Sequence, residues 1–133
     1  MANGLTGQYY ADMNLSNLVT SRTDATINYF SDGNVSPVPG IGKSNYSMRW
    51  SGFIKPNFSE MYMFNTVSDD GIRVKINNIT VINAWNYHSP QLNAGSIALS
   101  AGKMYPIEVE YFNGTGIAVA QLYWSSPSQP LQI

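Results

Sequence analysis

Alternation of apolar and polar side chains with a period of two is the feature of this 133-residue sequence that most restricts its fold. Successive side chains of a β-strand point to opposite faces, so an alternating stretch predicts a strand with one buried face. The stretches EMYMFNTV (60–67) and IRVKI (72–76) both alternate in this way. No stretch has the apolar spacing of a helix over three turns. The sequence therefore predicts an all-β protein with little or no helix.

Turn residues separate the predicted strands and limit how they connect. Asn77 and Asn78 stand between two apolar runs, and asparagine tolerates the positive φ of a two-residue hairpin turn. Ala101 and Gly102 mark a second turn. Pro106 has no N–H to donate to a ladder, so it predicts an edge strand or a bulge. Many short antiparallel strands close most naturally into a β-sandwich or flattened barrel, in a jelly-roll-like arrangement.

The length and composition indicate a single domain, residues 1–133, that depends on its core alone for stability. The chain has no cysteine, so no disulfide supports the fold. Its first 45 residues are rich in Gly, Pro, Ser and Asn and predict long loops with few strands. Only 11% of the residues are charged and the net charge is −1, so nucleic acid is not an expected partner.

The start of the chain and its hydropathy predict no membrane insertion. No run reaches the roughly 18 apolar residues of a membrane span, and MANGLTGQYY lacks the basic and apolar regions of a signal peptide. Either the chain is cytoplasmic, or it is a domain excised from a larger exported protein.

Two adjacent aspartates, Asp69 and Asp70, interrupt the strand pattern in VSDDGIRV. On an extended trans strand their side chains would point to opposite faces, so both would face one ion only if the backbone departed locally from that geometry. Ca²⁺ takes six to eight oxygen ligands and tolerates irregular geometry. The simpler alternative is a plain hairpin turn, because Asp and Gly are common turn residues.

Several motifs occur together in one order: GLTGQYY, YSMRWSGFI, YMFNTVSDDGIRVKI, VINAW, AGKMYPIEVEYF and LYWSSPSQ. From about Gly4 to Gln129 the sequence resembles the PA-fourteen domain family, named after the amino-terminal fragment of the anthrax protective antigen. The resemblance implies a β-sandwich that occurs, usually as a non-catalytic module, in glycosidases, bacterial surface proteins, toxins and yeast adhesins. In lectin members, adjacent aspartates joined by a cis peptide bond bind calcium, and the calcium binds sugar hydroxyls.

The resemblance places a second loop, FNGTGI, beside the aspartates. We therefore expect Ca²⁺ as the cofactor, and two neighbouring sugar hydroxyls would take coordination positions otherwise filled by water. The expected metal ligands are Asp69, Asp70, the side chain of Asn113 and the carbonyls of Thr115 and Ile117.

The stretch AWNYHSP supplies the other candidate ligand-binding residues, Trp85, Tyr87 and His88. They would either form a rim on which a sugar stacks or simply pack within a loop, and Trp85 alternatively belongs to the core. Trp50 and Trp124 are expected in the core.

Glu108 and Glu110 would share one strand face about 6 to 7 Å apart, a spacing used by inverting glycosidases. They lie on the polar face of an alternating strand, however, so we expect both to be exposed rather than held in a cleft that raises the pKa of an acid. No catalytic residues are assigned, and the protein is not expected to be an enzyme.

Taken together, these features predict a calcium-dependent carbohydrate-binding module that gives adhesion or polysaccharide targeting to an extracellular or cell-surface protein, most simply a bacterial one. Its partners would be a glycan or polysaccharide and the neighbouring domains of the parent protein. The alternative is a non-catalytic structural or protein-interaction module. The disulfides and the long inserted loop of yeast adhesins are absent here, so the resemblance does not specify the sugar.

Overall fold

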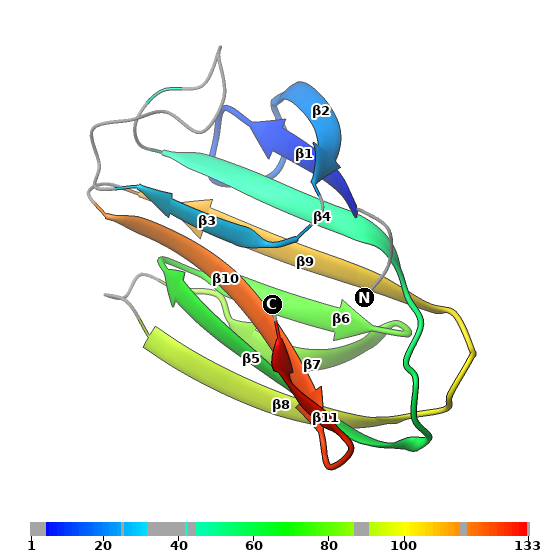
Figure 1. The fold of residues 1–133 in the computed structure, drawn as a ribbon. Helices are drawn as coiled ribbons and strands as arrows, with labels where there is room; N and C mark the ends of the chain where they lie inside the picture. Colours follow the sequence, from blue (N-terminus) through cyan, green and yellow to red (C-terminus); the bar gives the residue numbers. More distant parts are fainter. Residues whose placement is uncertain are drawn as a thin grey trace.

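A computed structural model describes residues 5–24, 26–31, 42, 45–86, 91–114 and 117–132 of the chain. It confirms the all-β prediction, with two antiparallel sheets packed as a sandwich (Figure 1). One sheet has the order β2-β1-β4-β9-β6-β7. Its strands are β1 (Leu5–Tyr10), β2 (Leu18–Asp24), β4 (Tyr46–Ile54), β6 (Ile72–Ile76), β7 (Ile79–Ala84) and β9 (Tyr105–Asn113).

The second sheet has the order β11-β10-β5-β8, and β3 pairs with β10. Its strands are β3 (Asn28–Ser31), β5 (Glu60–Asp69), β8 (Gln91–Leu99), β10 (Ala118–Ser126) and β11 (Gln129–Gln132). The strand β5 ends where β6 begins, so the chain crosses from one sheet to the other at the two adjacent aspartates.

The alternating stretches bury the faces that form the core between the sheets. On β5, Tyr62 and Phe64 are buried whereas Met61 and Met63 are exposed. Ile72 and the other apolar residues of β6 are buried as well. Trp50 and Trp124 are both 2% exposed, which confirms that they belong to the core.

The β6–β7 hairpin confirms the predicted turn. Ile76 pairs with Ile79, and both intervening asparagines have positive φ, 52° at Asn77 and 63° at Asn78. Two residues with positive φ give the type I′ geometry, whose twist matches that of the flanking strands.

The prediction of an edge strand or bulge at Pro106 is wrong. The strand β9 lies inside its sheet, between β4 and β6. Pro106 is its second residue and lies one residue before the first pairing with β6, which joins Ile76 to Ile107. A proline is tolerated at the start of a strand because the ladder does not yet need its N–H on both sides.

The prediction of long loops over the first 45 residues is only partly confirmed, because β1, β2 and β3 all fall within them. In β1 the alternation is short and breaks where Tyr9 and Tyr10, at 2% and 5% exposed, are both buried.

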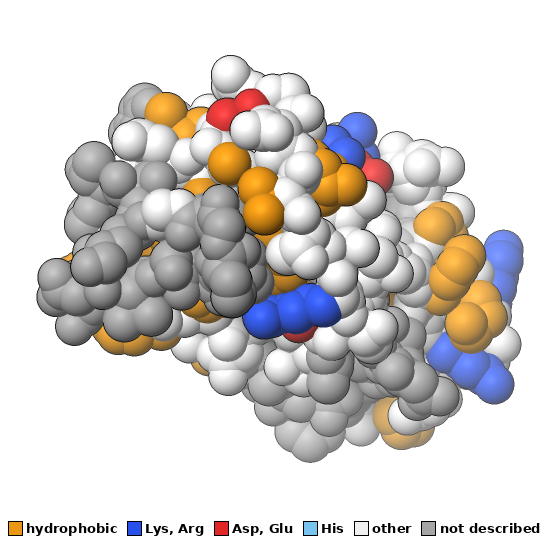
Figure 2. All heavy atoms as spheres, turned by 90° about the horizontal axis from the view of Figure 1, so that it is seen from above, with side chains coloured by type: hydrophobic (Ala, Val, Ile, Leu, Met, Phe, Trp, Pro, Cys, Tyr) orange, Lys and Arg blue, Asp and Glu red, His pale blue; other side chains and the backbone are white. Residues whose placement is uncertain are grey.

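The surface carries few charges, as the composition indicates. On the face drawn in Figure 2, the charged side chains form small separate groups rather than a continuous patch. None of the described elements is a helix of the length and hydropathy needed to cross a bilayer.

Candidate metal and carbohydrate site

Three of the predicted ligands meet at one end of the sandwich because of where their strands end. Asp69 is the last residue of β5, and Asn113 is the last residue of β9. The backbone N–H of Asp70 donates to the carbonyl of Phe112 at 3.2 Å, and the N–H of Phe112 donates to the carbonyl of Gly71 at 3.0 Å. This pair of hydrogen bonds holds the aspartate turn against the end of β9.

The aspartate pair is almost buried and is organised by backbone contacts. The Asp69–Asp70 peptide bond is cis, as the resemblance implies. Asp69 is 8% exposed and Asp70 is 7% exposed. The N–H of Gly114 donates to Oδ2 of Asp70 at 2.8 Å, and the hydroxyl of Tyr111 donates to the backbone carbonyl of Asp69 at 2.5 Å. The turn is therefore fixed to β9 and to the loop that follows it.

The side chain of Asn113 is the strongest indication of a ligand at this end. It is fully buried, and among the described residues neither its oxygen nor its nitrogen makes a hydrogen bond of ordinary geometry, although the amide lies close enough to the Tyr46 hydroxyl to affect it. A buried polar group left without a partner costs about 1–3 kcal/mol, so native proteins rarely leave one in place. An amide oxygen is an ordinary ligand for a hard cation, so the residues present fit a calcium ion.

Buried tyrosines surround this end, and the aspartates affect their protonation. Burial raises the pKa of Tyr111, and the charges of Asp69 and Asp70 add to the increase. Tyr46 pairs with Asn113 across β4 and β9. Burial raises the pKa of Tyr46, and the hydroxyl of Tyr29 and the charge of Asp69 raise it further. The nearby Asn113 amide lowers the same pKa but does not outweigh burial. Both phenols therefore stay neutral at working pH.

Further polar atoms lie inside the sandwich next to the aspartates along β5. The hydroxyls of Thr66 and Ser68 and the amide oxygen of Asn93 are buried without a hydrogen-bond partner. Thr66 pairs with Asn93 across β5 and β8. The interior is therefore polar at this end, in contrast to the aromatic core around Tyr62 and Trp124.

The structure places only part of the predicted second loop. Ile117 lies two residues from Val119, the partner of Asp69 in the β5–β10 ladder, and its side chain is 45% exposed. Thr115, Tyr87 and His88 lie outside the described residues. No group of three His, Cys, Asp or Glu side chains converges among the residues described. A metal here would thus depend on two carboxylates together with amide and carbonyl oxygens.

Trp85 lines a groove beside the aspartate turn. Its ring packs edge-to-face on Phe112 with centroids 4.8 Å apart, and Met13, Asn14 and Asn86 complete a groove of about 270 Å³. Trp85 is neither a core residue nor fully exposed, so the groove position agrees with the rim alternative. Phe112 in turn covers Gly71, where an added Cβ would lie 2.1 Å from the ring.

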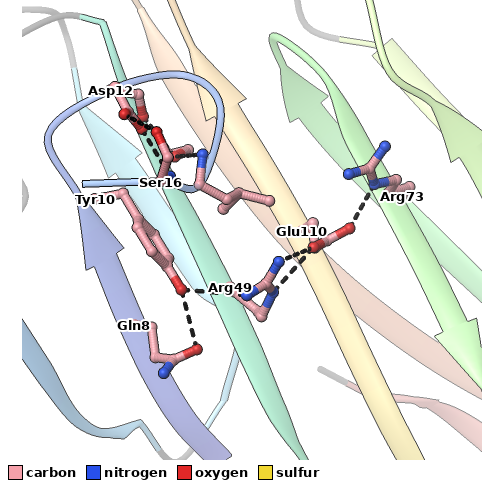
Figure 3. A network of polar contacts seen from close by, with 9 residues as sticks. Gln8, Tyr10, Asp12, Ser16, Arg49, Arg73 and Glu110 are labelled. Carbon is pink, nitrogen blue, oxygen red and sulfur yellow. Dashed lines mark hydrogen bonds and ion pairs between the residues drawn. The ribbon is translucent and has the colours of Figure 1, made fainter. Parts of the chain in front are cut away.

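The expectation that both glutamates are exposed is wrong, because Glu110 is buried and Glu108 is half-buried. Figure 3 shows Glu110 between Arg49 and Arg73. Its Oε2 lies 2.6 Å from Nη2 of Arg49, and its Oε1 lies 2.5 Å from Nε of Arg73. Burial would raise the pKa of Glu110, but the two guanidinium groups outweigh burial and hold that pKa below its usual range.

This ion-pair network reaches the groove, a connection that the sequence did not predict. The guanidinium of Arg73 lies over the ring of Trp85, 4.0 Å from its centroid. Glu110 therefore positions Arg73, and Arg73 positions Trp85. The only signal in the sequence is that Arg73 and Glu110 lie on the polar faces of alternating strands, which does not show that the two strands are neighbours.

A β-sandwich with an aspartate pair at the junction of its two sheets is the arrangement that the family resemblance implies, and the comparisons confirm that family. The model of the PA14 domain matches residues 1–132. The chain belongs to the PA14 domain family.

Similar proteins are longer than this chain or share only its fold. Anti-sigma-I factor RsgI3 of Acetivibrio thermocellus is 41% identical over 130 residues, which are 98% of this chain and 20% of that protein. An anti-sigma factor domain-containing protein from Clostridium clariflavum superposes with a TM-score of 0.93 at 41% identity, over 98% of this chain and 44% of that chain. A PA14 sugar-binding domain from an RTX adhesin gives a TM-score of 0.81 at 16% identity, over 100% and 95%. The last likeness shows the fold alone.

Proposed function

We propose that this domain is a calcium-dependent carbohydrate-binding module. The observation that carries the proposal is the fully buried Asn113 amide, which makes no hydrogen bond of ordinary geometry to the described residues and lies next to two carboxylates that are less than a tenth exposed. A buried amide and two carboxylates at one strand end form a set of hard oxygen donors, the kind that calcium prefers.

The residues of this end divide the task between holding an ion and holding a sugar. Asp69, Asp70 and Asn113 would hold the ion, with carbonyls of the loop 113–117 as further ligands. Bound calcium supplies open coordination positions for two neighbouring sugar hydroxyls. The hydrogen bond from Gly114 to Asp70 fixes one carboxylate in place, and the Trp85 groove would receive the apolar face of the sugar ring.

The relatives support a binding role within a larger protein. The chain spans about a fifth of the anti-sigma-I relative, and the RTX adhesin domain with the same fold is named for sugar binding. In this proposal the module gives its parent protein attachment to a polysaccharide outside the cell or at its surface, and it assigns no catalysis to the domain.

A glycan array probed with calcium and again with chelator tests the proposal, because it examines the ligand and the ion together. We expect tighter glycan binding in calcium, and loss of this calcium-dependent part of the binding in chelator. Asp70→Asn removes one charge but keeps an oxygen that accepts from Gly114, so it should fold and lose binding. Asp70→Ala also removes that acceptor. If wild type shows no calcium-dependent binding, or if Asp70→Asn keeps that calcium-dependent binding, the calcium bridge is wrong.

A protein-interaction role is the second candidate, favoured by one surface. Met61, Met63 and Leu92 are 54%, 43% and 66% exposed on the outer face of β5 and β8. Leu92 lies four residues along the ladder from the partner of Met63, and several exposed apolar side chains on one sheet face can mark an interface. A silent glycan array, together with a melting temperature unchanged by calcium, would favour this role over sugar binding.

A further inference from the structure

A second cleft lies far from the aspartates, on the outer face of the six-stranded sheet. Its volume is about 470 Å³, within the range of ligand sites. Tyr46 pairs with Asn113 at one end of the β4–β9 ladder, and Phe53 pairs with Pro106 beside this cleft at the other. Seven residues of extended strand separate Tyr46 from Phe53, so the two regions lie about 23 Å apart.

The strand register builds the floor of the cleft from four neighbouring strands. Thr6 on β1 pairs with Ser51 on β4, Ser51 pairs with Glu108 on β9, and Glu108 pairs with Lys75 on β6. Adjacent strands are about 4.8 Å apart, so this row of side chains spans about 14 Å. Such a row suits a chain-like ligand that lies across the strands.

The side chains of this row can donate and accept hydrogen bonds, as a site for uncharged hydroxyl groups requires. Lys75 and Glu108 face each other, yet the ion pairs within 4 Å among the described residues do not include them. The cleft thus offers a cationic donor and an anionic acceptor together with the hydroxyls of Thr6 and Ser51. Because the two charges cancel, a polyanion gains no net attraction, whereas sugar hydroxyls donate to one group and accept from the other.

An aromatic ring completes the cleft on one side. Phe53 is 51% exposed and lies beside Pro106. An exposed ring next to hydrogen-bonding groups resembles the general composition of small-molecule sites, in which apolar surface supplies contact area and a few polar groups set orientation. The C–H face of a pyranose ring matches this wall.

We propose that this cleft is a second carbohydrate subsite, which binds a segment of a neutral polysaccharide without calcium. Phe53 contacts the sugar ring, and Lys75 and Glu108 hydrogen-bond its hydroxyls. The carbohydrate specificity is consistent with the function proposed above, but no residue is shared with the aspartate site, so either site can fail alone. Two sites about 23 Å apart on one domain would increase its retention on a long polysaccharide.

Affinity electrophoresis of the 133-residue chain in chelator tests this subsite, with gels containing neutral xylan, glucomannan or galactan. We expect wild type to be retarded by at least one of these polysaccharides. Phe53→Ala should weaken that binding at least tenfold, and Glu108→Gln should weaken it severalfold. Asp70→Asn should leave it unchanged. Phe30→Ala is the matched control, because this phenylalanine is 64% exposed on the other sheet.

The outcomes separate the two sites. Retardation in chelator that depends on Phe53 and not on Asp70 supports the subsite even if the calcium site is wrong. Binding only in calcium, binding that Phe53→Ala does not weaken, or no binding of any of the three polysaccharides in chelator overturns it, while the aspartate site is judged by its own calcium dependence. Phe53→Tyr keeps the ring and should retain binding, which excludes a loss caused by misfolding.

Discussion

The two ends of the β4–β9 ladder present polar groups in different ways. At the Asn113 end the polar atoms are buried and held by the backbone: Gly114 donates to Asp70, and Tyr111 donates to the carbonyl of Asp69. At the Phe53 end the polar groups are side chains on an open sheet face, and Lys75 is exposed. The first arrangement suits a small ion that needs several fixed oxygens, and the second suits a larger ligand that adapts to flexible side chains.

Two other carboxylates, the half-buried Asp24 and the buried Glu110, make the difference clearer. Asp24 accepts from Arg22 at 2.8 Å and from the indole of Trp50 at 3.0 Å, and Glu110 is held by two arginines. Protein cations compensate these two carboxylates. The Asp69–Asp70 end differs because the neighbouring Asn113 amide makes no hydrogen bond of ordinary geometry within the part of the chain that the structure describes. The polar atoms around Asp24 and Glu110 already have hydrogen-bond or ion-pair partners, so we assign these two carboxylates to the fold. Asp69 and Asp70 lie beside an amide that lacks such a partner among the described residues, so we assign them to a ligand.

The largest expected effect on stability comes from substituting the glycine at the aspartate end. An added Cβ at Gly71 would lie 2.1 Å from the ring of Phe112, so Gly71→Ala should displace that ring and lower the free energy of unfolding by about 1–3 kcal/mol or more. It should also disturb the Trp85 groove and weaken calcium-dependent binding. Urea unfolding and sugar binding measure the two effects.

Gly102 is the matched control at the other end of the sandwich. Its φ is +76°, and nothing lies within 4 Å of an added Cβ. Gly102→Ala should therefore cost about 1–2 kcal/mol through backbone conformation alone and leave binding unchanged. Equal loss of binding in both variants would show that the effect of Gly71→Ala is not local to the aspartate site.

The next largest effect is the stabilisation by calcium itself. An ion that binds only the folded state adds about 2.7 kcal/mol at a hundredfold excess over Kd. For a domain of this size the melting temperature in calcium should exceed that in chelator by several degrees. Coincident melting curves in calorimetry would mean that the aspartate end does not hold calcium with useful affinity.

Asn113→Ala separates a metal ligand from a structural amide. Because the amide makes no hydrogen bond of ordinary geometry to the described residues, its removal should cost little in chelator beyond the cavity that it leaves and its weak interaction with the Tyr46 hydroxyl. In calcium the variant should lose most of the stabilisation seen in wild type. A large destabilisation that is equal in both conditions would show that Asn113 serves the fold rather than the ion.

Local pattern predicts the strands well and their neighbours poorly. The strands in residues 60–76 were predicted from the alternation of apolar and polar residues, because a strand with one buried face needs an apolar residue at every second position. The position of Pro106 was misjudged because an edge is defined by the absence of a neighbour, which is not a local property. Short alternation in β1 was likewise too weak to outweigh the surrounding Gly, Ser and Asn.

For the same reason, the sequence predicted some residues of the candidate site better than others: features local in the chain were predicted, and contacts between strands were not. The adjacent aspartates can be read directly from the sequence, and their cis bond was implied by the family resemblance. The burial of Glu110 did not, because the alternation gave the correct face but not the two arginines that cover it, which come from β4 and β6. The sequence did not decide whether Trp85 belongs to the core or to the rim of the site. Its ring contacts Phe112 from β9 and Arg73 from β6, and the sequence alone does not show that these strands are its neighbours.

The smallest expected effect concerns Glu110 and pH. The side chain of Glu110 is 7% exposed, whereas those of Arg49 and Arg73 are 31% and 35% exposed, so solvent screens part of the attraction. Glu110→Gln should therefore lower the free energy of unfolding by about 1–2 kcal/mol at neutral pH. It should weaken sugar binding modestly, because Arg73 would be held less firmly over Trp85.

The sign of the pH dependence follows from the lowered pKa of Glu110 in the folded state. A carboxyl whose pKa is lower when folded than when unfolded contributes stability that is fully present above the unfolded pKa, about 4.3, and is lost as pH falls through the folded pKa. The difference in unfolding free energy between wild type and Glu110→Gln should therefore be constant near neutrality and shrink below about pH 4. Asp12 and Glu60 also have lowered pKa values, but both proteins share them, so their contributions cancel in the difference. Urea unfolding of both proteins between pH 3 and 7 in chelator measures it. A difference that grows as the pH falls would show that the two arginines do not stabilise the charged form of Glu110.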